Sequence, residues 1–201
     1  MSVLVGREAP DFMVPAVLGS GEIVDNFNLK EAIRGQYGLL FFYPLDFTFV
    51  CPSELIALSH AIDEFKKRKV EVIAVSIDSQ FTHNAWRNTA IDKGGIGPVR
   101  YTLAADMSHS ICRSYGVEHP KVGVAFRGTF LIDRDGMVRW QMVNDLPLGR
   151  NIPDILRVVD ALQFFEEKGE VCPANWKKGA PGMRASPEGV AEYLAKHAED
   201  L

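Results

Sequence analysis

The segment around Cys51 constrains the fold of this chain most. The apolar run Leu39-Leu40-Phe41-Phe42-Tyr43 predicts a fully buried strand, and Pro44 ends it. After Cys51 a helix is predicted to about Lys69, from apolar residues at helical spacing: Leu55, Leu58, Ile62 and Phe65. Pro52 is compatible with a helix only in its first turn, so we expect Cys51 at the helix start.

A cysteine between a strand and a helix start is typical of a reactive thiol. It faces unpaired backbone N–H groups and the positive end of the helix dipole, which both favour the nucleophilic thiolate. Thr48, three residues earlier, offers a hydroxyl that can approach the sulfur or the group it attacks. The simpler alternative is a buried structural thiol, the commoner state of a cytosolic cysteine.

A cysteine hydrolase would need a histidine base near Cys51. His60 is nine residues further on, roughly 13 Å along the helix axis at 1.5 Å per residue, so it cannot serve. The remaining histidines stay open as bases, although none lies in a recognisable catalytic motif: His83, His109, His119 and His197.

The cysteine spacing also argues against metal and disulfide frameworks. Cys51, Cys112 and Cys172 are 61 and 60 residues apart, without C-x-x-C or paired histidine spacing, so no metal site is expected. Three widely separated cysteines are not a secreted disulfide framework, and Met1 to Glu8 lacks the features of a signal peptide. We therefore expect a cytoplasmic protein in which any functional disulfide is transient.

The composition limits the partners. With 201 residues, 47% hydrophobic and 24% charged, the chain is typical of a globular domain with an appendage. A net charge of −4 disfavours nucleic acid or an anionic membrane as the main partner. No stretch approaches the roughly 20 apolar residues of a membrane span, so no membrane association is expected.

Strand and helix patterns alternate along the chain and predict an α/β fold with a mixed sheet. Strands are expected over residues 12–17, 22–27, 39–43, 70–77, 100–104, 129–132 and 137–143, the first and last pairs being hairpins. Further helices are expected over residues 81–91, 108–115, 153–167 and 188–197. After Gly169 the chain becomes rich in proline and glycine, which indicates an arm outside the main core.

Several motifs together resemble one family. Pro44, Thr48 and Cys51 form a P-x-x-x-T-x-x-C signature, and Cys172 lies in Gly-Glu-Val-Cys-Pro-Ala. With Phe126-Arg127-Gly128 and the run Asn144-Asp145-Leu146-Pro147-Leu148-Gly149-Arg150, these segments closely resemble a typical 2-Cys peroxiredoxin of the alkyl hydroperoxide reductase C group. The resemblance extends from about residue 3 into the C-terminal arm.

The resemblance implies a thioredoxin-like fold with an N-terminal hairpin and an extended C-terminal arm. A peroxidase domain would span residues 3–162, and the arm, residues 163–201, would carry the resolving cysteine. It also implies a thiol-dependent peroxidase that reduces hydrogen peroxide and organic hydroperoxides without metal, haem or another cofactor. Over-oxidised family members can act as chaperones or peroxide sensors, which is the alternative function.

The resemblance also gives roles to individual residues. Cys51 would be the peroxidatic cysteine that becomes a sulfenic acid, with Thr48 bonding the sulfur and the peroxide and Pro44 shielding the site. Arg127 would stabilise the thiolate; without the resemblance it would be a solvated arginine. Cys172, otherwise a free arm cysteine, would resolve Cys51 of a partner subunit. A supporting ion pair is implied for Glu54 and Arg150.

Partners and regulation follow from the same resemblance. It implies a homodimer that assembles into a decamer, packed near Thr82, and a thioredoxin or flavoprotein disulfide reductase as electron donor. The loop Gly94-Gly95-Ile96-Gly97 and the pair Tyr193-Leu194 resemble family elements associated with over-oxidation, although Leu194 replaces the expected phenylalanine. Cys112 matches no family motif and is interpreted as a bystander.

Overall fold

The computed structural model describes residues 3–201. The chain forms two compact units, and the boundary between them in the sequence falls between Ile152 and Pro153. The first unit is built on a seven-stranded mixed sheet in the order β2-β1-β5-β4-β3-β6-β7. Its strands are β1 (Met13–Val17), β2 (Ile23–Asn28), β3 (Tyr37–Phe42), β4 (Val70–Ser76), β5 (Thr102–Ala105), β6 (Arg127–Ile132) and β7 (Val138–Asn144). Both predicted hairpins, β1–β2 and β6–β7, are present and antiparallel.

The centre of the sheet is parallel and fully buried. All six residues of β3 are buried, as its unbroken apolar run predicts for a strand covered on both faces. β3 pairs in parallel with β4, and β4 with β5, whereas β6 lies antiparallel to β3. The carboxyl end of β3 therefore lies beside the amino end of β6, which brings the segment after Phe42 towards Arg127.

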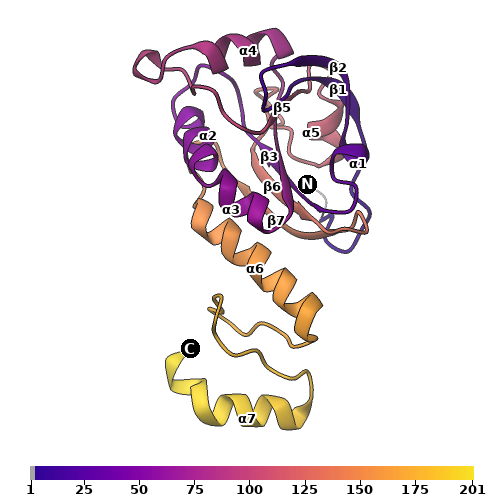
Figure 1. Cartoon of the computed structure of the whole chain (residues 1–201), viewed down its shortest axis with the longest axis vertical. Helices are drawn as coiled ribbons and strands as arrows, with labels where there is room; N and C mark the ends of the chain where they lie inside the picture. The colour runs from indigo at the N-terminus through magenta and orange to yellow at the C-terminus, as the bar shows by residue number, and fades with distance from the viewer. Residues whose placement is uncertain (1–2) are drawn as a thin grey trace. The chain divides into compact units, whose positions relative to one another are not determined.

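Helices cover both faces of this sheet (Figure 1): α1 (Leu29–Ala32) and α5 (Ser110–Ser114) lie on one side, and α2 (Cys51–His60) and α3 (Ile62–Lys67) on the other. The unit also contains α4 (Gln80–Asn88) and the 3₁₀ helix η1 (Ile91–Lys93). Successive side chains of β3 point to opposite faces of the sheet, so the strand contributes to the packing on both faces. Leu40 and Phe42 belong to the cluster that contains α5, whereas the ring of Phe41 packs against Arg150 near α2.

Two local details differ from the sequence prediction. The helix predicted from Cys51 to Lys69 is two helices, α2 and α3, because the chain bends at Ala61, whose ψ of −1° departs from helical values. Helix α1 was not predicted at all. It begins after Asn28, whose side chain accepts a hydrogen bond from the backbone N–H of Glu31 at 2.9 Å.

The second unit contains α6 (Ile152–Lys168) from its second residue onward, α7 (Pro187–His197) and the 3₁₀ helix η2 (Ala198–Asp200). The connection between α6 and α7 is the predicted proline- and glycine-rich segment. Within it Val171 and Met183 form an antiparallel bridge, and the buried Trp176 packs on Phe164 with ring centroids 4.9 Å apart. Among the described residues, no helix has the length and apolar character needed to cross a membrane.

Candidate active site around Cys51

The backbone between β3 and α2 places Cys51 as the sequence predicts. Pro44 is buried directly after the strand, and Cys51 is the first residue of α2, with Pro52 in the first turn. Ser53 donates a hydrogen bond from its hydroxyl to the carbonyl oxygen of Val50 at 2.6 Å, which supports this helix end. Cys51 itself is only 1% exposed.

A buried polar network holds the loop before Cys51. The Asp46 carboxylate accepts a hydrogen bond from the Tyr43 hydroxyl at 2.7 Å and lies 2.8 Å from Nδ1 of His83. The backbone N–H of Asp46 donates to Asp78 at 2.9 Å. Burial raises the pKa of Asp46, against the opposing hydrogen bond and charge of His83. The next residue, Phe47, takes a left-handed φ of 53°, which the network must stabilise because it is unfavourable for a non-glycine residue.

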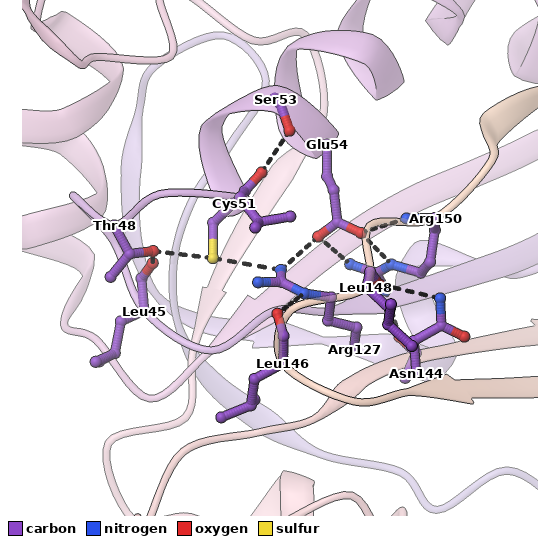
Figure 2. Close-up of polar contacts among 12 residues, drawn as sticks. Leu45, Thr48, Cys51, Ser53, Glu54, Arg127, Asn144, Leu146, Leu148 and Arg150 are labelled. Atoms are coloured by element: carbon purple, nitrogen blue, oxygen red, sulfur yellow. Dashed lines mark hydrogen bonds and ion pairs between the residues drawn. The ribbon is translucent and has the colours of Figure 1, made fainter.

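Thr48 and Arg127 approach the sulfur of Cys51 from two sides (Figure 2). The Thr48 hydroxyl lies 3.0 Å from Sγ and the Arg127 Nη1 group 3.5 Å from it. The same hydroxyl lies 2.8 Å from the carbonyl oxygen of Leu45. Since a hydroxyl carries one proton, Thr48 can donate to only one of these two acceptors at a time. A charged Cys51 thiolate would be a stronger hydrogen-bond acceptor than the neutral carbonyl oxygen of Leu45.

Arg127 is fixed by two further contacts. Its Nε group donates to the carbonyl oxygen of Leu146 at 2.7 Å, and Nη1 also donates to Glu54 at 2.7 Å. Arg150 holds the other side of Glu54, with its Nε and Nη2 groups 2.8 and 3.0 Å from the two carboxylate oxygens. Arg150 also donates to the carbonyl of Gly128 at 2.8 Å, so β6 anchors it. Figure 2 shows Glu54 between the two guanidinium groups.

The charges in this buried cluster leave an excess of one positive charge. Burial alone would raise the pKa of Glu54, but the hydrogen bonds and charges of Arg150 and Arg127 outweigh it and hold the pKa below its ordinary value. The carboxylate therefore stays ionised and balances one of two arginines, both of which are buried. A thiolate at Cys51 would bring the formal charge of this cluster to zero.

A pocket opens over the sulfur. Its walls are mostly apolar, with Thr48, Cys51 and Arg127 contributing the polar atoms and the remainder coming from Pro44, Phe49, Val50, Leu146 and Pro147. Phe49 is 97% exposed at this site, an unusual position for a large aromatic side chain. The pocket therefore offers a small substrate a mostly apolar wall together with the side chains of Thr48, Cys51 and Arg127.

The other two cysteines have different surroundings. Cys172 lies in the second unit, where its Sγ is 3.4 Å from the carbonyl oxygen of Ala161, and burial raises the pKa of its thiol. Cys112 is in α5 and 1% exposed. Burial, followed by the charges of Asp106 and Glu118, raises the pKa of Cys112 to about 12. All three cysteines are free thiols.

The structure thus brings together four residues that the sequence assigned to one site, Cys51, Thr48, Arg127 and Pro44. Glu54 and Arg150 form the expected ion pair beside them. Sequence reasoning missed the network of Asp46 and His83, because His83 comes from α4 and no local pattern links the two. It also missed the carbonyl of Leu146 as an acceptor for Arg127, although the run that contains it was singled out.

The structure also describes the segments that the resemblance associates with over-oxidation and assembly. The backbone at Gly95 passes so close to Thr89 that an added Cβ would lie 1.9 Å from the Thr89 carbonyl oxygen, which explains the need for glycine in this loop. Tyr193 packs on His197 within α7, and Leu194 is exposed. Thr82 is half-buried and bonds to Ser79, the N-cap of α4.

The chain is similar to known proteins along most of its length. The AhpC/TSA family matches residues 5–141, and the C-terminal domain of 1-Cys peroxiredoxin matches residues 161–196. The chain is 53% identical over 195 residues to alkyl hydroperoxide reductase C of Buchnera aphidicola, covering 97% of this chain and 99% of that protein. It is 50% identical over 199 residues to the Helicobacter pylori protein of the same name, covering 99% of this chain and 100% of that protein.

A solved structure confirms the fold. The reduced 2-Cys peroxiredoxin of Plasmodium vivax superposes with a TM-score of 0.93 at 48% identity, covering 96% of this chain and 100% of that one. The predicted thioredoxin-like fold is therefore confirmed. With the family matches, this shows that the chain belongs to the AhpC/TSA family and is a peroxiredoxin, an enzyme of the thiol-dependent peroxidase type.

Proposed function

We propose that this peroxiredoxin reduces hydrogen peroxide and organic hydroperoxides at Cys51. One observation carries the assignment. The Cys51 sulfur lies at a pocket between the Thr48 hydroxyl at 3.0 Å and the Arg127 guanidinium at 3.5 Å. This arrangement stabilises a thiolate and leaves hydrogen-bond donors on the side from which a substrate oxygen arrives.

The proposed first step is a displacement on oxygen. The Cys51 thiolate attacks the terminal oxygen of the hydroperoxide, so an S–O bond forms while the O–O bond breaks. The sulfur is oxidised to a sulfenic acid, and the other oxygen leaves with the electron pair of the O–O bond. It takes up a proton to become water or an alcohol. Negative charge therefore moves from the sulfur to the leaving oxygen during the step.

Arg127 and Thr48 are suited to follow this charge. The Nη2 group of Arg127 takes part in none of the contacts to Leu146, Glu54 or Cys51, and we assign it to the leaving oxygen. The Thr48 hydroxyl bonds the thiolate first and the peroxide as the charge moves. Because Arg127 is buried and Thr48 is half-buried and both already contact the sulfur, little reorganisation accompanies the reaction. Pro44 and Phe49 limit the access of water to the sulfur.

Cys172 is proposed as the resolving cysteine of a partner subunit. Its raised pKa keeps it a thiol near neutrality, and its contact to the Ala161 carbonyl is weak. Attack of its sulfur on the Cys51 sulfenic acid forms an intersubunit disulfide and releases water. Two electrons from thioredoxin or a flavoprotein disulfide reductase would return both cysteines to thiols. We propose that residues 3–162 form the peroxidase domain and that residues 163–201, which follow it in sequence, form the arm.

The remaining assignments rest on family likeness. We propose a homodimer assembled into a decamer, and a cytoplasmic location. Phe81, which is 67% exposed beside Thr82, provides an apolar surface for contact between dimers.

Non-reducing electrophoresis after one equivalent of peroxide tests the cycle. A disulfide-linked dimer should form in the wild type and in Cys112→Ala, and disappear in either Cys51→Ser or Cys172→Ser. Peroxide consumption with thioredoxin as reductant, measured in parallel, should be abolished by Cys51→Ser. Persistent wild-type monomer would overturn the intersubunit disulfide, and consumption that survives Cys51→Ser would overturn the peroxidatic role. Protection of a client protein from aggregation without peroxide turnover would instead support the chaperone alternative.

A further inference from the structure

Three potential metal ligands cluster away from the Cys51 site. His109, Cys112 and Glu118 each offer one ligand atom, and the three atoms all lie within 4.8 Å of one another. Cys112 belongs to the core cluster that contains Phe42, on the face of the sheet opposite α2. Nothing in the proposed peroxidase cycle uses these side chains.

The backbone around α5 creates this convergence. His109 immediately precedes the helix and takes a left-handed φ of 60°, which is uncommon for a non-glycine residue. Cys112 follows three residues later, so the two side chains lie on one side of the first turn. Glu118 comes from the segment after the helix, where it forms an isolated bridge with Ala125. Its carboxylate lies 2.9 Å from Nδ1 of His109.

The donor types identify the class of ion. One imidazole nitrogen, one sulfur and one carboxylate oxygen form the mixed set that Zn²⁺ accepts, whereas Mg²⁺ and Ca²⁺ prefer oxygen ligands throughout. A thiolate and a carboxylate together neutralise a divalent ion, which suits a site where Cys112 is buried and the other two residues are half-buried. We propose that His109, Cys112 and Glu118 bind a zinc-class divalent ion, with a water molecule in the fourth position.

Binding needs small changes at each ligand. The Cys112 thiol now lies 3.3 Å from the carbonyl oxygen of His109; it would lose its proton to solvent as the metal–sulfur bond forms. His109 would present a bare Nδ1, which it does when its proton is on Nε2. The Oε1 atom of Glu118 would turn to the ion in place of its present contacts.

Arg113 would keep the carboxylate oriented. Its Nε group donates to Oε2 of Glu118 at 2.9 Å, the oxygen that the ion leaves available. Partners that orient a metal ligand in this way typically contribute about 10–100-fold in metal affinity. The cysteine and histidine spacings gave no sign of this site, because it uses one residue of each type and a carboxylate from a separate segment.

Cobalt(II) is the probe, because thiolate ligation gives it a charge-transfer absorption. The full chain carrying Cys51→Ser and Cys172→Ser leaves Cys112 as the single thiol, so any thiolate band reports this site. We expect one Co²⁺ to bind with that band and Zn²⁺ to displace it. Adding Cys112→Ala should abolish the band, and His109→Ala or Glu118→Ala should weaken binding by at least about tenfold.

Matched controls separate ligation from folding. His60→Ala removes an exposed histidine outside the cluster and should leave Co²⁺ binding unchanged. Arg113→Ala keeps all three ligands and should weaken binding without removing the thiolate band. Zn²⁺ should raise the unfolding temperature of the parent and of His60→Ala, and less or not at all that of His109→Ala. The proposal is overturned if the parent shows no thiolate band, or if the band survives undiminished in His109→Ala and Glu118→Ala.

Discussion

Cys51 and Cys112 occupy the first turns of two helices in the same unit, and each is 1% exposed, yet the groups around the two sulfur atoms differ. Cys51 faces the Thr48 hydroxyl and the Arg127 guanidinium. Burial, followed by the carboxylates of Asp106 and Glu118, raises the pKa of Cys112 to about 12. Burial and a helix start are therefore not enough to activate a thiol. We propose that the hydrogen-bond donors beside the sulfur make Cys51 a nucleophile, whereas burial and the neighbouring carboxylates keep Cys112 protonated.

The largest difference should appear when each of the two cysteines is replaced in turn and peroxide consumption is compared. Cys51→Ser should reduce peroxide consumption to the background rate, since a serine hydroxyl does not ionise near neutrality. Cys112→Ala should keep the wild-type rate within about twofold, because its thiol is protonated at neutral pH. Stopped-flow measurement of peroxide loss over one turnover checks both. A comparable loss in Cys112→Ala would show that the contrast between the cysteines is wrong.

The arginines beside the two sulfurs provide the next comparison. Arg127→Gln should lower the second-order rate constant for peroxide by about 10²–10³-fold, the usual effect of removing one fixed donor to a developing charge. Arg113→Gln is the matched control, because Arg113 pairs with Glu118 beside Cys112, and it should leave this rate unchanged. Competition kinetics against a fast peroxide-consuming enzyme measures the constant. Equal rates in the two variants would remove the proposed role of Arg127.

Thr48 should contribute less than Arg127. Thr48→Val keeps the shape of the side chain but removes the hydrogen bond to the sulfur, a bond to a charged group that typically contributes about 1.5–3 kcal/mol, or roughly 10–100-fold in rate. Thr48→Ser keeps the hydroxyl and should retain most of the activity. The same single-turnover measurement separates the two. A serine variant as slow as the valine variant would indicate that Thr48 acts through packing rather than through its hydroxyl.

The parts of the fold that could be predicted from the sequence are those that depend on local patterns. The strand before Pro44, the helix start at Cys51 and both hairpins follow from apolar periodicity and turn residues, which act over a few positions. Asn28 and Glu31 also carried a readable capping signal for α1 that was overlooked. By contrast, no local signal marks the bend at Ala61.

The charged part of the site depends on long-range pairing. Arg127 reaches Cys51 because β6 lies antiparallel to β3, a contact between segments 76 residues apart, and Arg150 reaches Glu54 across 96 residues. Periodicity does not show such contacts, so only family resemblance could assign these residues. The surroundings of Cys112 involve residues close in sequence, since Asp106 and Glu118 are each six positions away, but no motif marks them and they flank the short helix α5 on both sides.

The smallest expected effect is on the pH dependence of stability. The folded chain raises the pKa of Cys112 from an ordinary 9.0 to about 12, so between these values the folded state holds a proton that the unfolded state has lost. The free energy of unfolding should therefore fall as pH rises from about 9 to about 12, whereas below pH 9 this contribution is constant. Cys51→Ser with Cys172→Ser removes the other thiols, and adding Cys112→Ala removes the titrating group.

Urea unfolding in the presence of a chelator, at about pH 8 and about pH 10.5, measures the difference. The parent should lose more stability between the two pH values than the variant with Cys112→Ala, since tyrosines and lysines titrate in both. Equal losses would mean that Cys112 titrates like an exposed thiol. The carboxylates of Asp106 and Glu118 would then have no measurable influence on the sulfur. In that case neither burial nor the two carboxylates would hold the proton on Cys112 above about pH 9, and the contrast with Cys51 would rest on the Thr48 hydroxyl and the Arg127 guanidinium alone.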